Sequence, residues 1–169
     1  MTKIAFFDVD GTMINVPHQL LKPTDKTIHA LKEFQKQGNY IVVASARGVK
    51  PEYLDEIPFD GFIGCDGGYI EFHQEVLLNN VFSVKDLNLQ NSVYEATNGQ
   101  YIISERATSY FSDVDGELIK KHLKLYNGTD KLPDDYDDHW RFQNIKANTV
   151  TALFYNAKDL HEALDMLPQ

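Results

Sequence analysis

The sequence KIAFFDVDGT at residues 3–12 decides how the rest of the chain is interpreted. Its apolar run from Ile4 to Phe7 is short and does not alternate, as is typical of a strand buried on both faces of a parallel sheet. Ligands of such sheets bind at the carboxyl ends of the strands, where Asp8 and Asp10 follow. In an extended segment, residues two apart point the same way, so the two carboxylates reach one small volume and repel unless a cation or a proton lies between them. We interpret this pattern as a magnesium site with a carboxylate free to act as nucleophile, and a simple strand-ending turn is the alternative.

A second strand with a polar carboxyl end follows one helix later. Thr24 is a plausible N-cap for a helix that ends near Gly38, and Tyr40–Ala44 is rich in branched residues. Strand, helix and strand at this spacing predict two neighbouring parallel strands. The Ser45 hydroxyl then lies where it can donate to a phosphoryl oxygen, and the Arg47 guanidinium matches phosphate or carboxylate oxygens. A turn serine and a surface arginine are the alternative interpretations.

The motif Asp8-Val9-Asp10-Gly11-Thr12 resembles the first motif of the haloacid dehalogenase superfamily of phosphotransferases, in particular its Cof-type branch. The resemblance implies that Asp8 attacks phosphorus and forms an aspartyl-phosphate. Asp10 would protonate the leaving group and then activate water, and both acids would serve a Mg²⁺ cofactor. Ser45 would be the Ser or Thr of the family's second motif. The phosphate- and substrate-binding residues would be Gly11, Thr12, Ser45, Ala46 and Arg47.

The order of the predicted elements indicates an α/β fold in two parts. Residues 1–80 are expected to form a partial Rossmann-like parallel core sheet, which ends in a hairpin. Residues 81–169, with helices expected near 83–96 and 115–126, resemble the α/β cap domain that Cof-type phosphatases insert over the cleft. The pattern Asp113-Val114-Asp115-Gly116 repeats the letters of the first motif, but it is interpreted as a helix start. The acidic loop at residues 130–138 is interpreted as a solvated loop.

Composition restricts the partners of this chain. The net charge of −9 argues against nucleic-acid and anionic-membrane partners, but it leaves a small phosphorylated metabolite open because a local metal and Arg can reverse the field within one cleft. The single Cys65 excludes an internal disulfide and is interpreted as a small buried residue. No apolar run approaches the roughly 20 residues that span a bilayer, and no signal peptide is expected. These features predict a cytoplasmic protein.

The family pattern is incomplete after Val150, where neither the Lys nor the Gly-Asp-Gly-x-Asn-Asp stretch of Cof-type proteins is found. The chain is therefore expected to be truncated before the third and fourth motifs, and its core sheet is expected to expose an edge that favours self-association. Two hypotheses follow. One is a magnesium-dependent phosphatase that hydrolyses a small phosphate monoester, such as a sugar phosphate, through an aspartyl-phosphate. The other is a truncated, non-catalytic remnant that binds a phosphometabolite or has a regulatory role.

Overall fold

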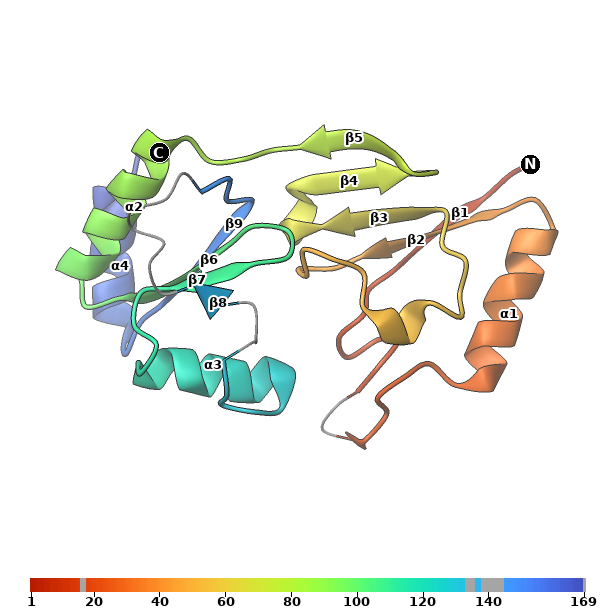
Figure 1. Ribbon diagram of the computed structural model, residues 1–169, viewed down its shortest axis with the longest axis horizontal. Helices are drawn as coiled ribbons and strands as arrows, with labels where there is room; N and C mark the ends of the chain where they lie inside the picture. The colour runs from red at the N-terminus through yellow and green to blue at the C-terminus, as the bar shows by residue number, and fades with distance from the viewer. Residues whose placement is uncertain (16–17, 133–135, 138–144, 169) are drawn as a thin grey trace. The chain divides into compact units, whose positions relative to one another are not determined.

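The computed structural model describes residues 1–15, 18–132, 136–137 and 145–168. Contacts divide the chain into two compact units, Met1–Asn80 and Val81–Gln169, and each is described here by itself (Figure 1). Part of the predicted acidic loop, including Asp134, Asp135 and Asp138, lies outside the described residues.

The first unit begins with the predicted pair of parallel strands. Strand β1 (Ile4–Phe7) and strand β2 (Tyr40–Ala44) pair in register from Ile4 opposite Tyr40 to Phe7 opposite Val43. Helix α1 (Asp25–Lys36) connects them, and the predicted cap is confirmed because the Thr24 hydroxyl accepts a hydrogen bond from the Thr27 N–H at 3.2 Å. The apolar face of α1 packs on these strands, so the sequence prediction of a parallel unit is confirmed.

Three further strands complete a five-stranded sheet in the order β1-β2-β3-β4-β5. Strand β3 (Gly61–Gly64) runs parallel to β2, and the hairpin of β4 (Tyr69–Phe72) and β5 (Glu75–Asn79) adds two antiparallel strands. A short 3₁₀ turn at Glu52–Leu54 lies in the connection between β2 and β3. The sheet is therefore mixed, with its parallel part at the strands that precede the candidate site residues.

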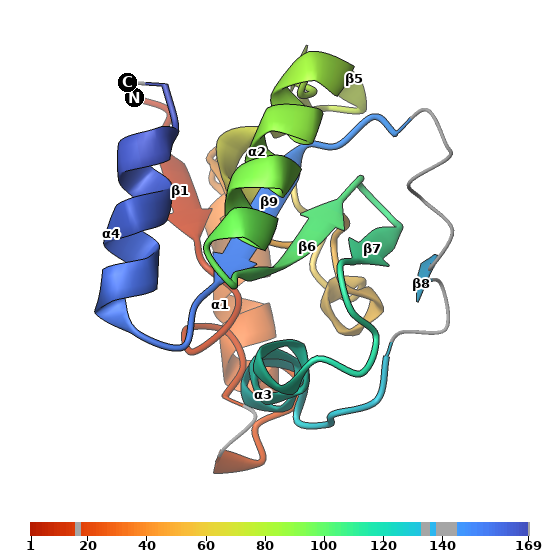
Figure 2. The same ribbon diagram turned by 90° about the vertical axis from the view of Figure 1, so that its left-hand side faces the viewer.

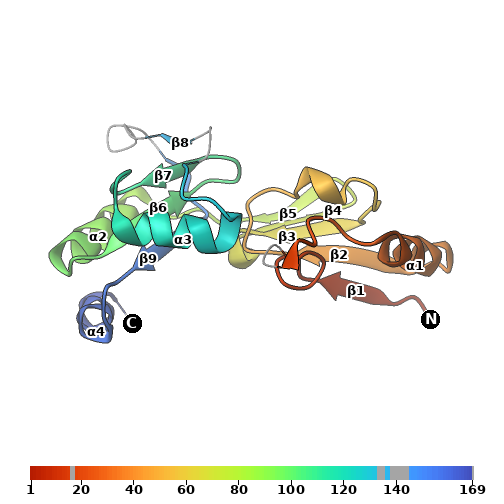
Figure 3. The same ribbon diagram turned by 90° about the horizontal axis from the view of Figure 1, so that it is seen from below.

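The prediction that β1 is buried on both faces is wrong. Ala5 and Phe7 pack against the core of the first unit together with α1, but Ile4 and Phe6 are 52% and 61% exposed. The reason is topological, because β1 forms one edge of the sheet and only one of its faces is covered within the described part of this unit (Figure 3). Self-association through this edge remains a prediction.

Asp60 joins four parts of the first unit at the amino end of β2. Its carboxylate accepts hydrogen bonds from the backbone N–H of Ile41 at 2.8 Å and from the side-chain amide of Gln35 on α1 at 2.9 Å. The ring of His73, in the β4–β5 turn, lies 3.4 Å from the other carboxylate oxygen. A partly buried carboxylate with these partners ties the helix, the sheet and the hairpin together.

We expect Asp60→Ala to lower the free energy of unfolding by about 2–3 kcal/mol, because it leaves the Ile41 N–H without its acceptor and the Gln35 amide with the Pro58 carbonyl alone. Asp55→Ala is the matched control. Within the described ranges, the Asp55 side chain pairs with Lys50 on the surface, so its loss is expected to change stability by less than about 1 kcal/mol. Urea denaturation followed by circular dichroism measures both, and equal stabilities of the two variants would contradict the role given to Asp60.

The second unit is a four-stranded sheet in the order β8-β7-β6-β9, with helices on both faces. Helix α3 packs on one face through Ile119 and Leu123. Helices α2 and α4 cover the other and lie side by side (Figure 2). The elements are α2 (Val84–Ala96), β6 (Gln100–Ser104), β7 (Ser109–Phe111), α3 (Glu117–Asn127), β8 (Tyr136–Asp137), β9 (Thr149–Leu153) and α4 (Ala157–Met166). Within the described residues, none of these helices is long and apolar enough to cross a membrane.

The repeated pattern at 113–116 is a turn before α3, as predicted, but the helix is capped differently. Asp113 accepts a hydrogen bond from the Asp115 N–H at 3.0 Å and thereby closes the turn. The first helical N–H groups are instead satisfied by Gln100 of β6, whose side-chain oxygen accepts from Leu118 and Ile119. A side chain distant in the sequence therefore replaces the local cap.

Candidate active site

The segment after β1 folds into a tight turn around the Val9 carbonyl. This oxygen accepts hydrogen bonds from the N–H groups of Met13 at 2.9 Å and Ile14 at 3.0 Å. Gly11 has φ +88°, the left-handed conformation that glycine adopts at low cost, which is the tight exit expected of it. Val9 is fully buried, whereas Asp8 and Asp10 on either side of it are exposed. The alternation therefore presents both carboxylates on the outer side of the turn.

Thr12 orients the Asp8 carboxylate. Its hydroxyl donates to Asp8 Oδ2 at 3.0 Å, across one turn of the loop. No described residue donates a hydrogen bond to the other oxygen, Oδ1. One Asp8 oxygen is thus fixed, and the second is open to a ligand.

Arg47 holds the Asp10 carboxylate in a bidentate ion pair. Its Nε and Nη2 donate to Asp10 Oδ2 and Oδ1, both at 2.9 Å. The side chains are 34% and 35% exposed, so solvent screens this pair only in part. The hydrogen bonds to Asp10 raise the pKa of the Arg47 guanidinium, against the opposing effect of its burial. The two residues predicted at neighbouring strand ends therefore meet directly.

Ser45 positions the backbone of Arg47. Its hydroxyl oxygen accepts a hydrogen bond from the Arg47 N–H at 3.2 Å, and the residue is buried. Because a hydroxyl can accept and donate together, this contact does not use the Ser45 proton, and its donation to a phosphoryl oxygen stays a prediction. Ala46 lies exposed between them.

The loop after β3 supports Arg47 from a third strand. The Cys65 N–H donates to the Arg47 carbonyl at 3.0 Å, and Cys65 is buried as predicted. Gly64 is required here, because a Cβ atom would lie 2.8 Å from the Arg47 carbonyl oxygen and 2.3 Å from the Phe62 ring. Cys65 and Asp66 both have positive φ, at 53° and 51°, which non-glycine residues adopt only when the surroundings impose it.

Tyr53 is a residue of this region that the sequence analysis missed. Its hydroxyl oxygen is buried and has no hydrogen-bond partner among the described residues. Burial raises the pKa of Tyr53, while the charge of Arg47 lowers it and the charge of Asp10 raises it. The phenol thus lies within the electrostatic reach of the ion pair. Nothing in the sequence distinguishes it from an ordinary core tyrosine.

The acids suit a magnesium ion only in part. Mg²⁺ is commonly held by one or two carboxylates, with water and substrate phosphate oxygens completing the shell. The carboxylate of Asp8 is available as such a ligand, and that of Asp10 would be available once Arg47 released it. Among the residues that the structure describes, no group of three Asp, Glu, His or Cys side chains forms a metal site. The donor set present therefore fits a magnesium ion that takes its remaining ligands from elsewhere.

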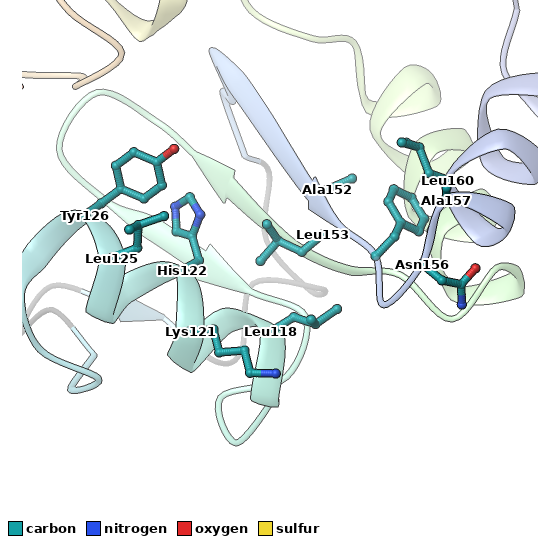
Figure 4. Close-up of a pocket in the computed structure, with 11 residues that line it drawn as sticks. Leu118, Lys121, His122, Leu125, Tyr126, Ala152, Leu153, Asn156, Ala157 and Leu160 are labelled. Carbon is teal, nitrogen blue, oxygen red and sulfur yellow. The ribbon is translucent and has the colours of Figure 1, made fainter.

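The second unit contains an open pocket of about 680 Å³ between α3, β9 and α4 (Figure 4). Its wall is mostly apolar, and His122 of α3 contacts the ring of Tyr126 at a centroid distance of 4.6 Å. Burial lowers the pKa of His122, which favours the neutral imidazole. The sequence analysis did not predict this pocket. Its lining residues are Leu118, Lys121, His122, Leu125, Tyr126, Ala152, Leu153, Phe154, Asn156, Ala157 and Leu160.

Comparison with known proteins identifies the family. The family model for haloacid dehalogenase-like hydrolases matches residues 5–169, which is nearly the whole chain. The chain belongs to this family. The Bacillus subtilis protein named "Putative phosphatase YkrA" is 25% identical to this haloacid dehalogenase-like hydrolase over 166 residues, which cover 96% of the chain and 56% of that protein.

Solved structures show the same fold for this haloacid dehalogenase-like hydrolase. The HAD subclass IIB sugar phosphatase BT4131 superposes with a TM-score of 0.73 at 21% identity, over 98% of this chain and 63% of that one. A structure from a study of a trigonal-bipyramidal intermediate in a phosphoryl-transfer superfamily gives a TM-score of 0.75 at 22% identity, over 99% and 64%. The chain thus spans just over half of the curated relative and less than two thirds of these structures.

Proposed function

We propose that this chain carries the nucleophile and the general acid/base of a magnesium-dependent phosphatase for small phosphate monoesters. The observation that carries the proposal is the ion pair between Asp10 and Arg47, which joins the segments that follow two neighbouring parallel strands, with Asp8 two residues before Asp10. Two carboxylates supply a nucleophile and a proton donor, and a guanidinium binds the phosphate oxygens. Membership of the haloacid dehalogenase-like hydrolases supports this assignment.

The contacts of Asp8 assign its two oxygens. Because Thr12 holds Oδ2, the free Oδ1 attacks phosphorus while the ester oxygen leaves, which gives an aspartyl-phosphate on Asp8. Asp10 protonates the leaving oxygen and then takes a proton from the water that cleaves the acyl phosphate. Arg47 and the Ser45 hydroxyl bind the phosphoryl oxygens during both steps. For this role the Arg47 side chain must release Asp10.

Asp8 and Asp10 are the residues that would hold Mg²⁺ in this proposal. The ion would neutralise the negative charge that the carboxylates and the phosphate bring together. This requirement follows from charge alone, because two neighbouring carboxylates and a phosphate dianion repel one another without a cation.

We further propose that residues 1–80 are the catalytic core and that residues 81–169 are the cap that selects the substrate. The division of the chain at Asn80 and Val81 supports this proposal. A sugar phosphate is the proposed substrate class, because the fold is shared with a sugar phosphatase of subclass IIB.

Hydrolysis of p-nitrophenyl phosphate by this chain tests the proposal. We expect release of inorganic phosphate that requires Mg²⁺ and stops when the metal is chelated, since the single positive charge of Arg47 does not balance two carboxylates and a bound phosphate. A folded chain that binds phosphate without turnover would contradict the proposed phosphatase activity and favour the hypothesis of a non-catalytic remnant. Circular dichroism of the same sample establishes that the chain is folded.

A further inference from the structure

The Tyr53 hydroxyl is a buried polar group without a partner among the described residues. It lies within the electrostatic reach of the ion pair between Arg47 and Asp10. Tyr53 belongs to the short 3₁₀ turn Glu52–Leu54, whose Leu54 is fully buried in the core of the first unit. The turn therefore fixes where the phenol lies. A buried hydroxyl is almost always hydrogen-bonded in proteins, so an orphan of this kind indicates that its partner arrives in another state.

Arg47 is fixed at its backbone and free to move only through its side chain. Ser45 accepts from its N–H, and Cys65 donates to its carbonyl. Its guanidinium uses Nε and Nη2 on Asp10, which leaves further N–H donors unassigned by this pair. A phosphate dianion offers the same bidentate geometry as a carboxylate with more charge, and therefore competes with Asp10 for Arg47.

We propose that Tyr53 is a positioning residue, whose hydroxyl accepts a hydrogen bond from the Arg47 guanidinium when a phosphate draws this side chain away from Asp10. The inference rests on the proposed function, because it assigns the second position of Arg47 in the same site. Arginine only donates hydrogen bonds, so its partners must be acceptors, and a tyrosine oxygen qualifies. With the Tyr53 hydroxyl on one side and phosphate on the other, the guanidinium is held in this second position. Asp10 is then free to transfer protons.

The electrostatics agree with this arrangement. Tyr53 raises the pKa of Arg47, after the larger effects of the Asp10 hydrogen bonds and of burial, which opposes them, and this places the two side chains within reach of each other's charge. The backbones of both residues are held, that of Tyr53 by the core and that of Arg47 by its hydrogen bonds to Ser45 and Cys65. The proposed change is therefore one of the Arg47 side chain.

The test compares Tyr53→Phe with the wild type, using inorganic phosphate as the probe. Isothermal titration calorimetry measures phosphate affinity, and the Arg47 Nε–H signal in a ¹H–¹⁵N spectrum, assigned with Arg47→Lys, reports the guanidinium. We expect phosphate to shift this signal in the wild type. We expect Tyr53→Phe to bind phosphate about tenfold more weakly, equivalent to about 1.4 kcal/mol. Its melting temperature should equal or exceed that of the wild type, because a buried orphan hydroxyl has been removed.

Tyr155→Phe, at an exposed tyrosine of the second unit, is the control and should change neither property. Equal phosphate affinity of Tyr53→Phe and wild type would overturn the inference, as would an Arg47 signal that ignores phosphate or a Tyr53→Phe variant that melts well below wild type. Tyr53-dependent phosphate binding without hydrolysis of p-nitrophenyl phosphate would support the inference and refute the proposed function. Hydrolysis of p-nitrophenyl phosphate together with phosphate binding that does not depend on Tyr53 would support the proposed function and refute the inference.

Discussion

Asp8→Asn is expected to lower magnesium-dependent hydrolysis of p-nitrophenyl phosphate by about a thousandfold or more. An amide has neither the charge nor the nucleophilic oxygen of a carboxylate, so the aspartyl-phosphate cannot form. The fold should survive, because Asp8 is exposed and its one described side-chain contact, the hydroxyl of Thr12, can donate equally well to an amide oxygen. Steady-state release of inorganic phosphate measures the loss.

The chain provides its own control for this substitution. Asp113 occupies the first position of the repeated letters Asp-Val-Asp-Gly in the second unit, where it only closes a turn. Asp113→Asn keeps an oxygen that accepts from the Asp115 N–H and should hydrolyse p-nitrophenyl phosphate at the wild-type rate. If Asp8→Asn retained more than about a tenth of the wild-type rate, Asp8 would not be the nucleophile.

Asp10→Asn is expected to reduce steady-state turnover by about a hundredfold to ten-thousandfold, which is typical of removing a general acid/base. The two chemical steps should respond differently. p-Nitrophenolate leaves with little help from an acid, so Asp8 can still be phosphorylated, whereas the water of the second step loses its base. The variant should therefore release a burst of p-nitrophenolate and then stall as the phosphorylated protein.

Rapid mixing measures this burst, and mass spectrometry of the acid-quenched protein detects one added phosphoryl group. Asp115→Asn is the matched control, because Asp115 is the second aspartate of the repeated pattern and pairs with Lys120 on the surface. It should behave as wild type. Undiminished turnover of Asp10→Asn, or slow turnover without a phosphorylated protein, would exclude the role proposed for Asp10.

The local order of the chain was predictable because it depends on neighbours in the sequence. Thr24 was recognised as a helix cap, and it accepts the expected backbone hydrogen bond. The parallel pairing of β1 with β2 followed from their spacing around one helix. The short strand β7 was missed, because its three residues carry too little pattern to separate them from a turn.

Contacts between distant residues were beyond reach of the sequence. The exposure of Ile4 and Phe6 depends on the place of β1 at the sheet edge, since a continuous apolar run looks the same whether one face or two are covered. The cap of α3 by Gln100 depends on a helix and a strand meeting in space. Neither fact leaves a local pattern.

The candidate site divides in the same way. The sequence by itself determined the candidates for the chemistry, because Asp8, Asp10, Ser45 and Arg47 follow two recognisable strands. Only the tertiary structure decided that Arg47 holds Asp10 and that Thr12 bonds to one Asp8 oxygen. It also decided that the buried Tyr53 hydroxyl has no hydrogen-bond partner among the described residues. Strand order brings side chains to one sheet edge, but rotamers and burial determine which of them touch.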